Sequence, residues 1–127
     1  MRVSEGLQAA CEAAVAMVMR EVKGARAVVI STEDGFEIAS HTENTAEVSR
    51  LSAMASSIAA LGAIAGEESR IGACDNVVIA GVQGHIVLRQ VRRDDVSLVL
   101  SLVAGHDAIV GQMLYFSRQA TRAMEKA

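Results

Sequence analysis

The longest charge-free stretch of the sequence runs from Leu51 to Gly66, within a predicted helix from Thr45 to about Ser69. Projected at ~3.6 residues per turn, this helix has one face of bulky side chains and an opposite face of small, uncharged ones. A helix that only covers its own sheet is expected to show charged side chains to solvent. We therefore predict that this helix is buried on both faces, the bulky face in the core and the small face against a second molecule. The bulky face comprises Leu51, Met54, Ile58 and Leu61, and the small face comprises Ser49, Ser52, Ala53, Ser56, Ala60 and Ala63.

A second copy of the chain is the simplest partner, because a twofold axis makes one patch complementary to itself. The predicted strand 76–82 points the same way, since it carries no charge after Asp75. At the edge of a sheet it would lack the lysines and prolines that normally prevent edge pairing. We predict a homodimer that joins helix to helix and strand to strand, with Val77, Val78 and Ile79 in the interface.

Length, charge and cysteine content narrow the class of protein. The 127 residues are predicted to form one domain, 1–127, and the net charge of −3 with few aromatic residues argues against a nucleic-acid partner. No apolar run approaches the roughly 20 residues needed to span a bilayer, so no membrane span is expected. Glu5 and Glu12 do not fit a signal peptide. Cys11 and Cys74 are predicted to be free thiols, which indicates a cytoplasmic location.

Hydrophobic periodicity and turn signals give the order of the remaining elements. Three predicted strands follow the long helix with only short turns between them, as in an antiparallel meander. The fold class is therefore α+β, a three-layer α/β/α sandwich with a five-stranded antiparallel sheet, in the order α-β-β-α-β-β-β-α. The elements are a helix over 4–23 capped by Ser4 and ended by Gly24, strands 25–31 and 36–41 around a turn at 33–35, the helix from Thr45 capped by Asn44, strands 76–82, 85–92 and 96–103, and a last helix capped by Asp107.

Residues that carry chemistry do not form a specific pattern. There is no glycine-rich phosphate loop, and His41, His85 and His106 lie in separate segments without metal-ligand spacing. Three arginines, at 89, 92 and 93, are interpreted as part of a solvated turn rather than as groups that stabilise a transferring phosphate. We predict no catalytic, cofactor-binding or metal-binding residue, and a protein that is not an enzyme.

A family resemblance rests on the first hairpin, with 24–31, Asp34-Gly35 and 38–40, on the Ala/Ser-rich helix, on the Val-rich meander, and on Gly111 near the start of the last helix. These segments resemble roadblock (dynein light chain) domains of the bacterial free-standing type. The resemblance covers nearly the whole chain and implies a longin- or profilin-like fold that dimerises through the second helix and the third strand. It also implies a small Ras-like GTPase as partner, with the protein accelerating hydrolysis or acting as a platform. Glu47 and Arg50 would then be contacts on the surface of the paired helices.

Other functions and assemblies are compatible with the same sequence. A small-ligand or haem-type sensor on a profilin-like fold would use one of the three histidines as a ligand. A structural subunit of a larger complex would need only an exposed protein-binding face. The chain could also pair with a paralogue instead of itself, or hold an unrecognised catalytic site.

Overall fold

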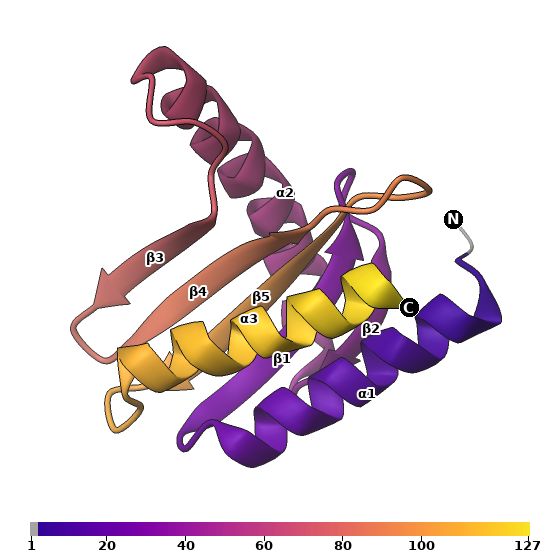
Figure 1. The fold of residues 1–127 in the computed structure, drawn as a ribbon. Coiled ribbons are helices and arrows are strands. Elements are labelled where there is room, and N and C mark those ends of the chain that lie inside the picture. Colours follow the sequence, from indigo (N-terminus) through magenta and orange to yellow (C-terminus); the bar gives the residue numbers. More distant parts are fainter. Residues whose placement is uncertain (1–2) are drawn as a thin grey trace.

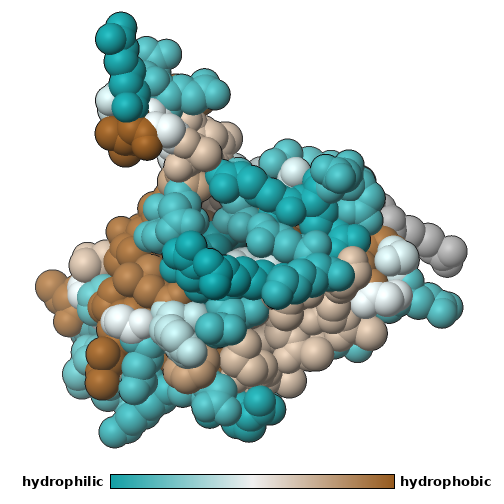
Figure 2. All heavy atoms as spheres, in the orientation of Figure 1, coloured by the Kyte–Doolittle hydropathy of each residue, from teal (hydrophilic) through white to brown (hydrophobic). Residues whose placement is uncertain are grey.

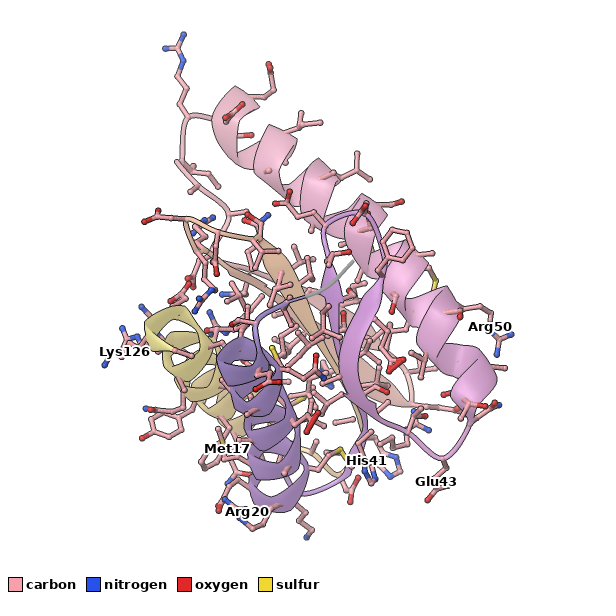
Figure 3. All side chains as sticks on the ribbon, turned by 90° about the vertical axis from the view of Figure 1, so that its right-hand side faces the viewer. Met17, Arg20, His41, Glu43, Arg50 and Lys126 are labelled. Carbon is pink, nitrogen blue, oxygen red and sulfur yellow. The ribbon has the colours of Figure 1, made fainter. Side chains whose placement is uncertain are left out.

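The computed structural model describes residues 3–127 and has three layers (Figure 1). A five-stranded antiparallel sheet carries helices α1 (Glu5–Glu21) and α3 (Val110–Lys126) on one face and α2 (Thr45–Glu68) on the other. Figure 3, turned by 90°, shows α1 and α3 side by side and α2 alone across the sheet. The predicted fold class and order of elements are confirmed.

The strand order is β2-β1-β5-β4-β3, so β3 lies at the edge of the sheet, the position on which the predicted strand-to-strand contact depends. Every neighbouring pair is antiparallel. The last strand begins two residues later than predicted, because residues 92–97 form a loop that reaches the end of α3. The strands are β1 (Ala25–Thr32), β2 (Glu37–His41), β3 (Asn76–Gly81), β4 (Gly84–Val91) and β5 (Leu98–Gly105).

The two faces of the sheet have cores of different size. Alternation along β1 sends Val28 and Ile30 to the face under α1 and α3, and Val29 to the face under α2. The first face holds the main core, with large side chains such as Met113. The second face is covered largely by small or branched residues of α2 and has a smaller core; its buried members are Val29, Val48, Leu51, Ala55, Ala59, Leu88 and Val99.

Two helix starts follow the predicted capping pattern. The Ser4 hydroxyl accepts a hydrogen bond from the Leu7 amide at 3.2 Å, and the Asn44 side chain accepts one from the Ala46 amide at 3.0 Å. Each cap satisfies one of the backbone N–H groups that a helix start leaves without an intrahelical partner.

The predicted cap at Asp107 is wrong. Helix α3 begins after Ile109, and no side chain caps it. Asp107 instead lies against Gly24, where an added Cβ would come within 2.6 Å of its Oδ1 atom. Gly24 has φ +82°, so it both adopts the left-handed turn after α1 and leaves room for the carboxylate.

Candidate functional site on α2 and β3

The side of α2 that faces the sheet differs from the prediction. Its buried residues are Val48, Leu51, Ser52, Ala55, Ala59 and Gly66. Met54 and Leu61, predicted to lie in the core, are 52% and 65% exposed, whereas Ser52, predicted at a partner interface, is 1% exposed. Large side chains on the sheet, including Leu88, leave room only for small residues of the helix above them. The helix is therefore rotated so that Ala55 and Ala59 face the sheet together with Val48 and Leu51, while Met54 and Leu61 face outward.

The small residues of α2 also make contacts within the chain. The Ser56 hydroxyl donates a hydrogen bond to the Glu33 carbonyl oxygen in the turn between β1 and β2. A Cβ added to Gly35, in the same turn, would lie 3.8 Å from the Cα atom of Ala53. Thus part of the predicted interface face supports this hairpin. Ser49 and Ala60 are exposed, and Ala63 is half-buried.

The second half of α2 extends past the edge of the sheet (Figure 1). Ile64 is exposed there, and Ile71, just after the helix, is 81% exposed. Figure 2 shows a small hydrophobic patch among hydrophilic residues at this projecting end, and a larger hydrophobic area on the β3 side of the molecule. Exposed apolar area that gathers on neighbouring elements is typical of a surface that binds another protein.

Strand β3 borders this surface and has one unpaired edge. Its backbone pairs only with β4. Val78 and Ile79 are exposed, and Val77 is half-buried against the alanines of α2. An unpaired apolar edge strand is a template for strand addition. Helix α2 and strand β3 together therefore offer an apolar helix side and a free strand edge on one side of the chain.

Glu47 and Arg50 lie at the other end of α2, where the structure brings both beside an open groove. The groove has a volume of about 580 Å³, and Met54 and Val103 also line it. Arg50 is exposed and points away from the rest of the chain (Figure 3). A surface with an apolar groove and two unlike charges fits a protein partner.

Helix α2 is also long and apolar enough to cross a membrane by length and composition. Only 28% of its most apolar 18-residue window is buried. It packs on the sheet through Leu51, Ala55 and Ala59, so part of its apolar surface belongs to the core of the protein. The absence of a membrane span stays a prediction.

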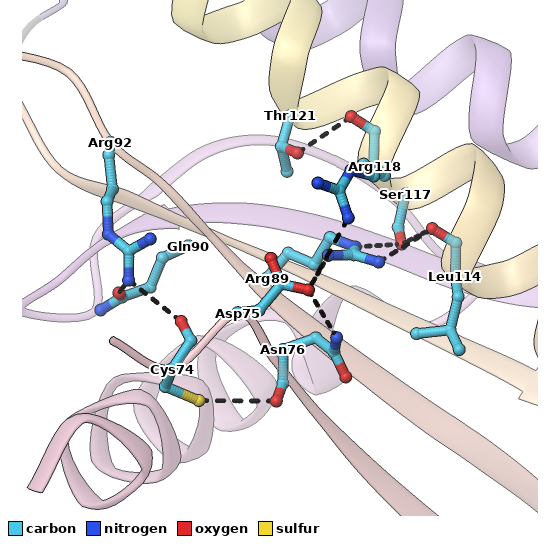
Figure 4. A network of polar contacts seen from close by, with 10 residues as sticks. All are labelled: Cys74, Asp75, Asn76, Arg89, Gln90, Arg92, Leu114, Ser117, Arg118 and Thr121. Carbon is cyan, nitrogen blue, oxygen red and sulfur yellow. Dashed lines mark hydrogen bonds and ion pairs between the residues drawn. The ribbon is translucent and has the colours of Figure 1, made fainter. Parts of the chain in front are cut away.

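A buried arginine fixes the start of β3. Arg89, on β4, is 5% exposed, and its guanidinium donates to the Ser117 hydroxyl at 2.9 Å and to the Leu114 carbonyl oxygen at 3.0 Å (Figure 4). It also donates to the Asp75 carboxylate at 3.2 Å, just before β3. The solvated-turn interpretation is therefore wrong for Arg89. Arg89 lies on the same face of β4 as the buried Val87 and Val91, because side chains two residues apart point the same way in a strand. This spacing was the signal in the sequence that the arginine faces the core.

The other two arginines of this group also hold segments in place. Arg93 donates to the carbonyl oxygens of Met124 and Ala127 at 2.6 and 2.7 Å, and thus binds the C-terminal end of α3. Arg92 donates to the Cys74 carbonyl oxygen at 3.0 Å (Figure 4). The hydrogen bond from the Asn76 side chain and the charge of Arg89 hold the pKa of Asp75 below its ordinary value. All three arginines therefore have structural roles.

The histidines remain on separate segments: His41 ends β2, His85 lies near the start of β4, and His106 follows β5. Within residues 3–127, no three or more His, Cys, Asp or Glu side chains form a group that could hold a metal ion.

A sheet with two helices on one face and a single long helix beside a free edge strand on the other is the fold of roadblock/LC7 domains. The similar solved structures include the Roadblock/LC7 domain from Streptomyces avermitilis, with 17% identity, TM-score 0.81, and coverage of 91% of this chain and 94% of that one. The gliding protein MglB from Thermus thermophilus has 16% identity, TM-score 0.83, and coverage of 98% and 92%. An MglB with a tetrameric arrangement has 16% identity, TM-score 0.84, and coverage of 98% and 91%. No protein-family model and no curated protein matches the sequence. The resemblance to roadblock domains is thus confirmed in the fold.

Proposed function

We propose that this protein is a self-associating, non-enzymatic regulator or scaffold of a small Ras-like GTPase. The observation that carries the proposal is the exposed apolar side of α2 next to the unpaired edge of β3. The roadblock fold supports it, and so does a structural relative, an MglB with a tetrameric arrangement. We also propose a cytoplasmic location, which the free thiols of Cys11 and Cys74 support.

A second copy of the chain can cover both features at once. A twofold axis near the β3 edge would pair strand with strand and place α2 beside α2. Met54, Leu61 and Ile64 join the proposed interface because they are exposed. Ser52 is excluded from the proposed interface because its side chain is buried within its own chain. The proposed interface thus comprises Ser49, Ala53, Met54, Ser56, Ala60, Leu61, Ala63, Ile64, Val77, Val78 and Ile79.

The paired helices would form the docking surface for the GTPase. Glu47 and Arg50 are exposed, flank the groove beside α2, and form none of the ion pairs found within residues 3–127. Unlike charges at the rim of an apolar surface orient a partner and speed its association. We propose these two residues as GTPase contacts.

Affinity capture from the native cells, in parallel with GDP and with a non-hydrolysable GTP analogue, tests the partner. Recovery of a small GTPase in one nucleotide state supports a regulator, and recovery in both states supports a scaffold. Recovery of none overturns the GTPase role. The Glu47→Arg/Arg50→Glu variant, captured in the same way, is expected to lose the GTPase; its oligomeric state is measured by light scattering alongside. Retention of the GTPase by this variant would remove the two residues from the contact surface.

A further inference from the structure

Three serine hydroxyls that are buried between α2 and the sheet have no hydrogen-bond partner among residues 3–127. They belong to Ser31 on β1, Ser52 on α2 and Ser101 on β5, and these residues are at most 1% exposed. A hydroxyl loses its hydrogen bonds to water when it is buried, so burial without a new partner costs free energy. The contact between α2 and the sheet therefore carries an energetic cost along with its apolar packing.

The other buried hydroxyls of the described chain do have partners. Thr32 donates a hydrogen bond to the carboxylate of Asp34 in the turn between β1 and β2. Ser117 and Thr121 each donate to a backbone carbonyl oxygen of α3 at 3.1 Å. The buried hydroxyls without a partner are therefore gathered at one contact, that of α2 with the sheet.

The two sheet serines lie close together on the face under α2. Val29 and Val99 pack on this face, and Ser31 and Ser101 lie two residues further along the same strands, so their side chains also point to α2. In the ladder between β1 and β5, Val29 pairs with Ser101 and Ser31 pairs with Val99. The two serines are thus diagonal neighbours across two central strands.

Helix α2 offers few large side chains to offset this cost. It has 24 residues, of which six are buried. Only Val48 and Leu51 among the six are bulky, and the other four are Ser52, two alanines and a glycine; the half-buried Ile58 packs beside them. Ser52 lies about one helical turn after Val48, so both side chains point to the sheet. The helix is held on the sheet by a small apolar contact that includes an unsatisfied hydroxyl.

We propose that α2 separates from the sheet as a unit while the rest of the chain stays folded, and that Ser31, Ser52 and Ser101 lower the free energy of this opening. In the open state, water reaches the three hydroxyls and supplies the hydrogen bonds that the closed state lacks. The main core lies on the other face of the sheet, with α1 and α3, so it does not have to unfold with α2 (Figure 3).

Opening would regulate the surface that α2 carries. A partner that binds only the closed form shifts the equilibrium towards closure, and the free energy of opening is subtracted from its affinity. This coupling rests on the proposed function, whereas the opening itself does not.

Hydrogen exchange of backbone amides, under conditions where it reports the opening equilibrium, tests the proposal. The amides of residues 51–59 in α2 are compared with those of β1 and β5, and all proteins are measured at one concentration so that self-association contributes equally. In the wild type, the α2 amides are expected to exchange faster than those of β1 and β5. The triple variant Ser31→Ala/Ser52→Ala/Ser101→Ala is expected to slow α2 exchange about tenfold or more, because the closed state no longer buries unsatisfied hydroxyls.

Ser49→Ala is the matched control, since Ser49 is exposed on the same helix. It raises helix propensity as Ser52→Ala does, and is expected to slow α2 exchange by about twofold at most. Circular dichroism checks that every variant is folded, and the single variant Ser101→Ala, with a smaller change in the same direction, serves if the triple variant does not fold.

Two results would overturn the proposal. If the wild-type α2 amides exchange at the rate of those of β1 and β5, α2 opens only when the whole chain unfolds. If the triple variant exchanges as fast as the wild type or faster, the hydroxyls have partners in the folded protein, such as a bound water molecule, and do not promote opening. Neither result depends on a GTPase, so an affinity capture that recovers none overturns the proposed function and leaves the opening of α2 standing.

Discussion

The guanidinium of Arg89 lies 3.2 Å from the carboxylate of Asp75, and this contact joins the residue before β3 to a buried position under α3. Arg118 of α3 lies 3.9 Å from the same carboxylate. The start of the edge strand is therefore fixed by side chains of β4 and α3, on the face of the sheet opposite α2. A surface on α2 and β3 thus depends on a polar network on the other face.

Replacing Arg89 with methionine should destabilise the protein by about 2 kcal/mol, since a buried hydrogen-bonding group is lost and the Leu114 carbonyl oxygen loses a donor. The cost is moderate because the Asp75 carboxylate is 62% exposed and can be solvated by water. Urea unfolding measures the change. Arg122→Met, an exposed arginine of α3, is the control and should stay within about 0.5 kcal/mol of wild type. Equal stabilities of the two variants would contradict a structural role for Arg89.

Asp75→Asn should change how stability depends on pH. Because the folded-state pKa of Asp75 lies below its ordinary value of 3.8, the carboxylate stabilises the fold above that pH. This contribution is lost as the pH falls through the folded-state pKa. The wild type should therefore lose its advantage over Asp75→Asn as the pH is lowered below 3.8. Thermal unfolding of both proteins across the acid range measures it, and parallel curves would show that the carboxylate is not perturbed.

Ala60→Glu should yield a monomer, because a charge would be buried in the proposed contact between two α2 helices. Ala60 is exposed, so the single chain should fold normally. Ser56→Glu should act in the same direction but would also remove the Ser56 hydrogen bond to the Glu33 carbonyl oxygen. Ala13→Glu, at an exposed position of α1 on the opposite layer, is the matched control. Light scattering gives the mass of each variant, and a stable Ala60→Glu dimer would place the contact elsewhere.

The Cys11 thiol should resist alkylation in the folded protein. Cys11 is fully buried, and burial raises its pKa from 9.0 to about 11, so little thiolate is present at pH 8. Because the folded-state pKa is the higher one, the thiol stabilises the fold below pH 9.0 and this contribution is lost as the pH rises towards about 11. Mass spectrometry after iodoacetamide treatment, with and without denaturant, should find Cys11 labelled only in denaturant. Rapid labelling of the native protein would show that α1 opens.

Arg70→Gly should stabilise the isolated chain by about 1 kcal/mol, because glycine relieves the strain of a left-handed residue at the end of α2. The measurement is made in the Ala60→Glu background, so that self-association does not contribute. A neutral effect would show that Arg70 is not strained at this position.

Local signals in the sequence predicted much of this fold. Ser4 and Asn44 cap helices as expected, and Gly24 and Gly35 adopt the positive φ angles that their turns require. These features depend on a few neighbouring residues, so they can be recognised without knowledge of the rest of the chain.

The orientation of α2 could not be predicted in the same way. Both faces of α2 are uncharged. The helical projection therefore shows that Met54 and Ala55 point in different directions, but not which of the two packs on the sheet. The choice depends on Leu88 and Val99, which come from strands far along the chain and fill the space beneath the alanines. The burial of Arg89 likewise depends on α3. Sequence reasoning therefore located the candidate surface but assigned part of it to the wrong side of the helix.

Because α2 projects past the sheet, the local stability of its end should depend on the protein concentration as well as on contacts within the chain. The last turns of α2 project past the sheet (Figure 1) and pack only against the segment that follows them, which contacts Gly66 through Gly72. Their exposed backbone hydrogen bonds open easily in water. A second copy that covers these turns would protect their amide hydrogens by mass action. Hydrogen exchange at the end of α2 should then slow as protein concentration rises, while exchange in β1 and β5 stays constant. Dilution alone would then increase the local unfolding of the C-terminal end of α2.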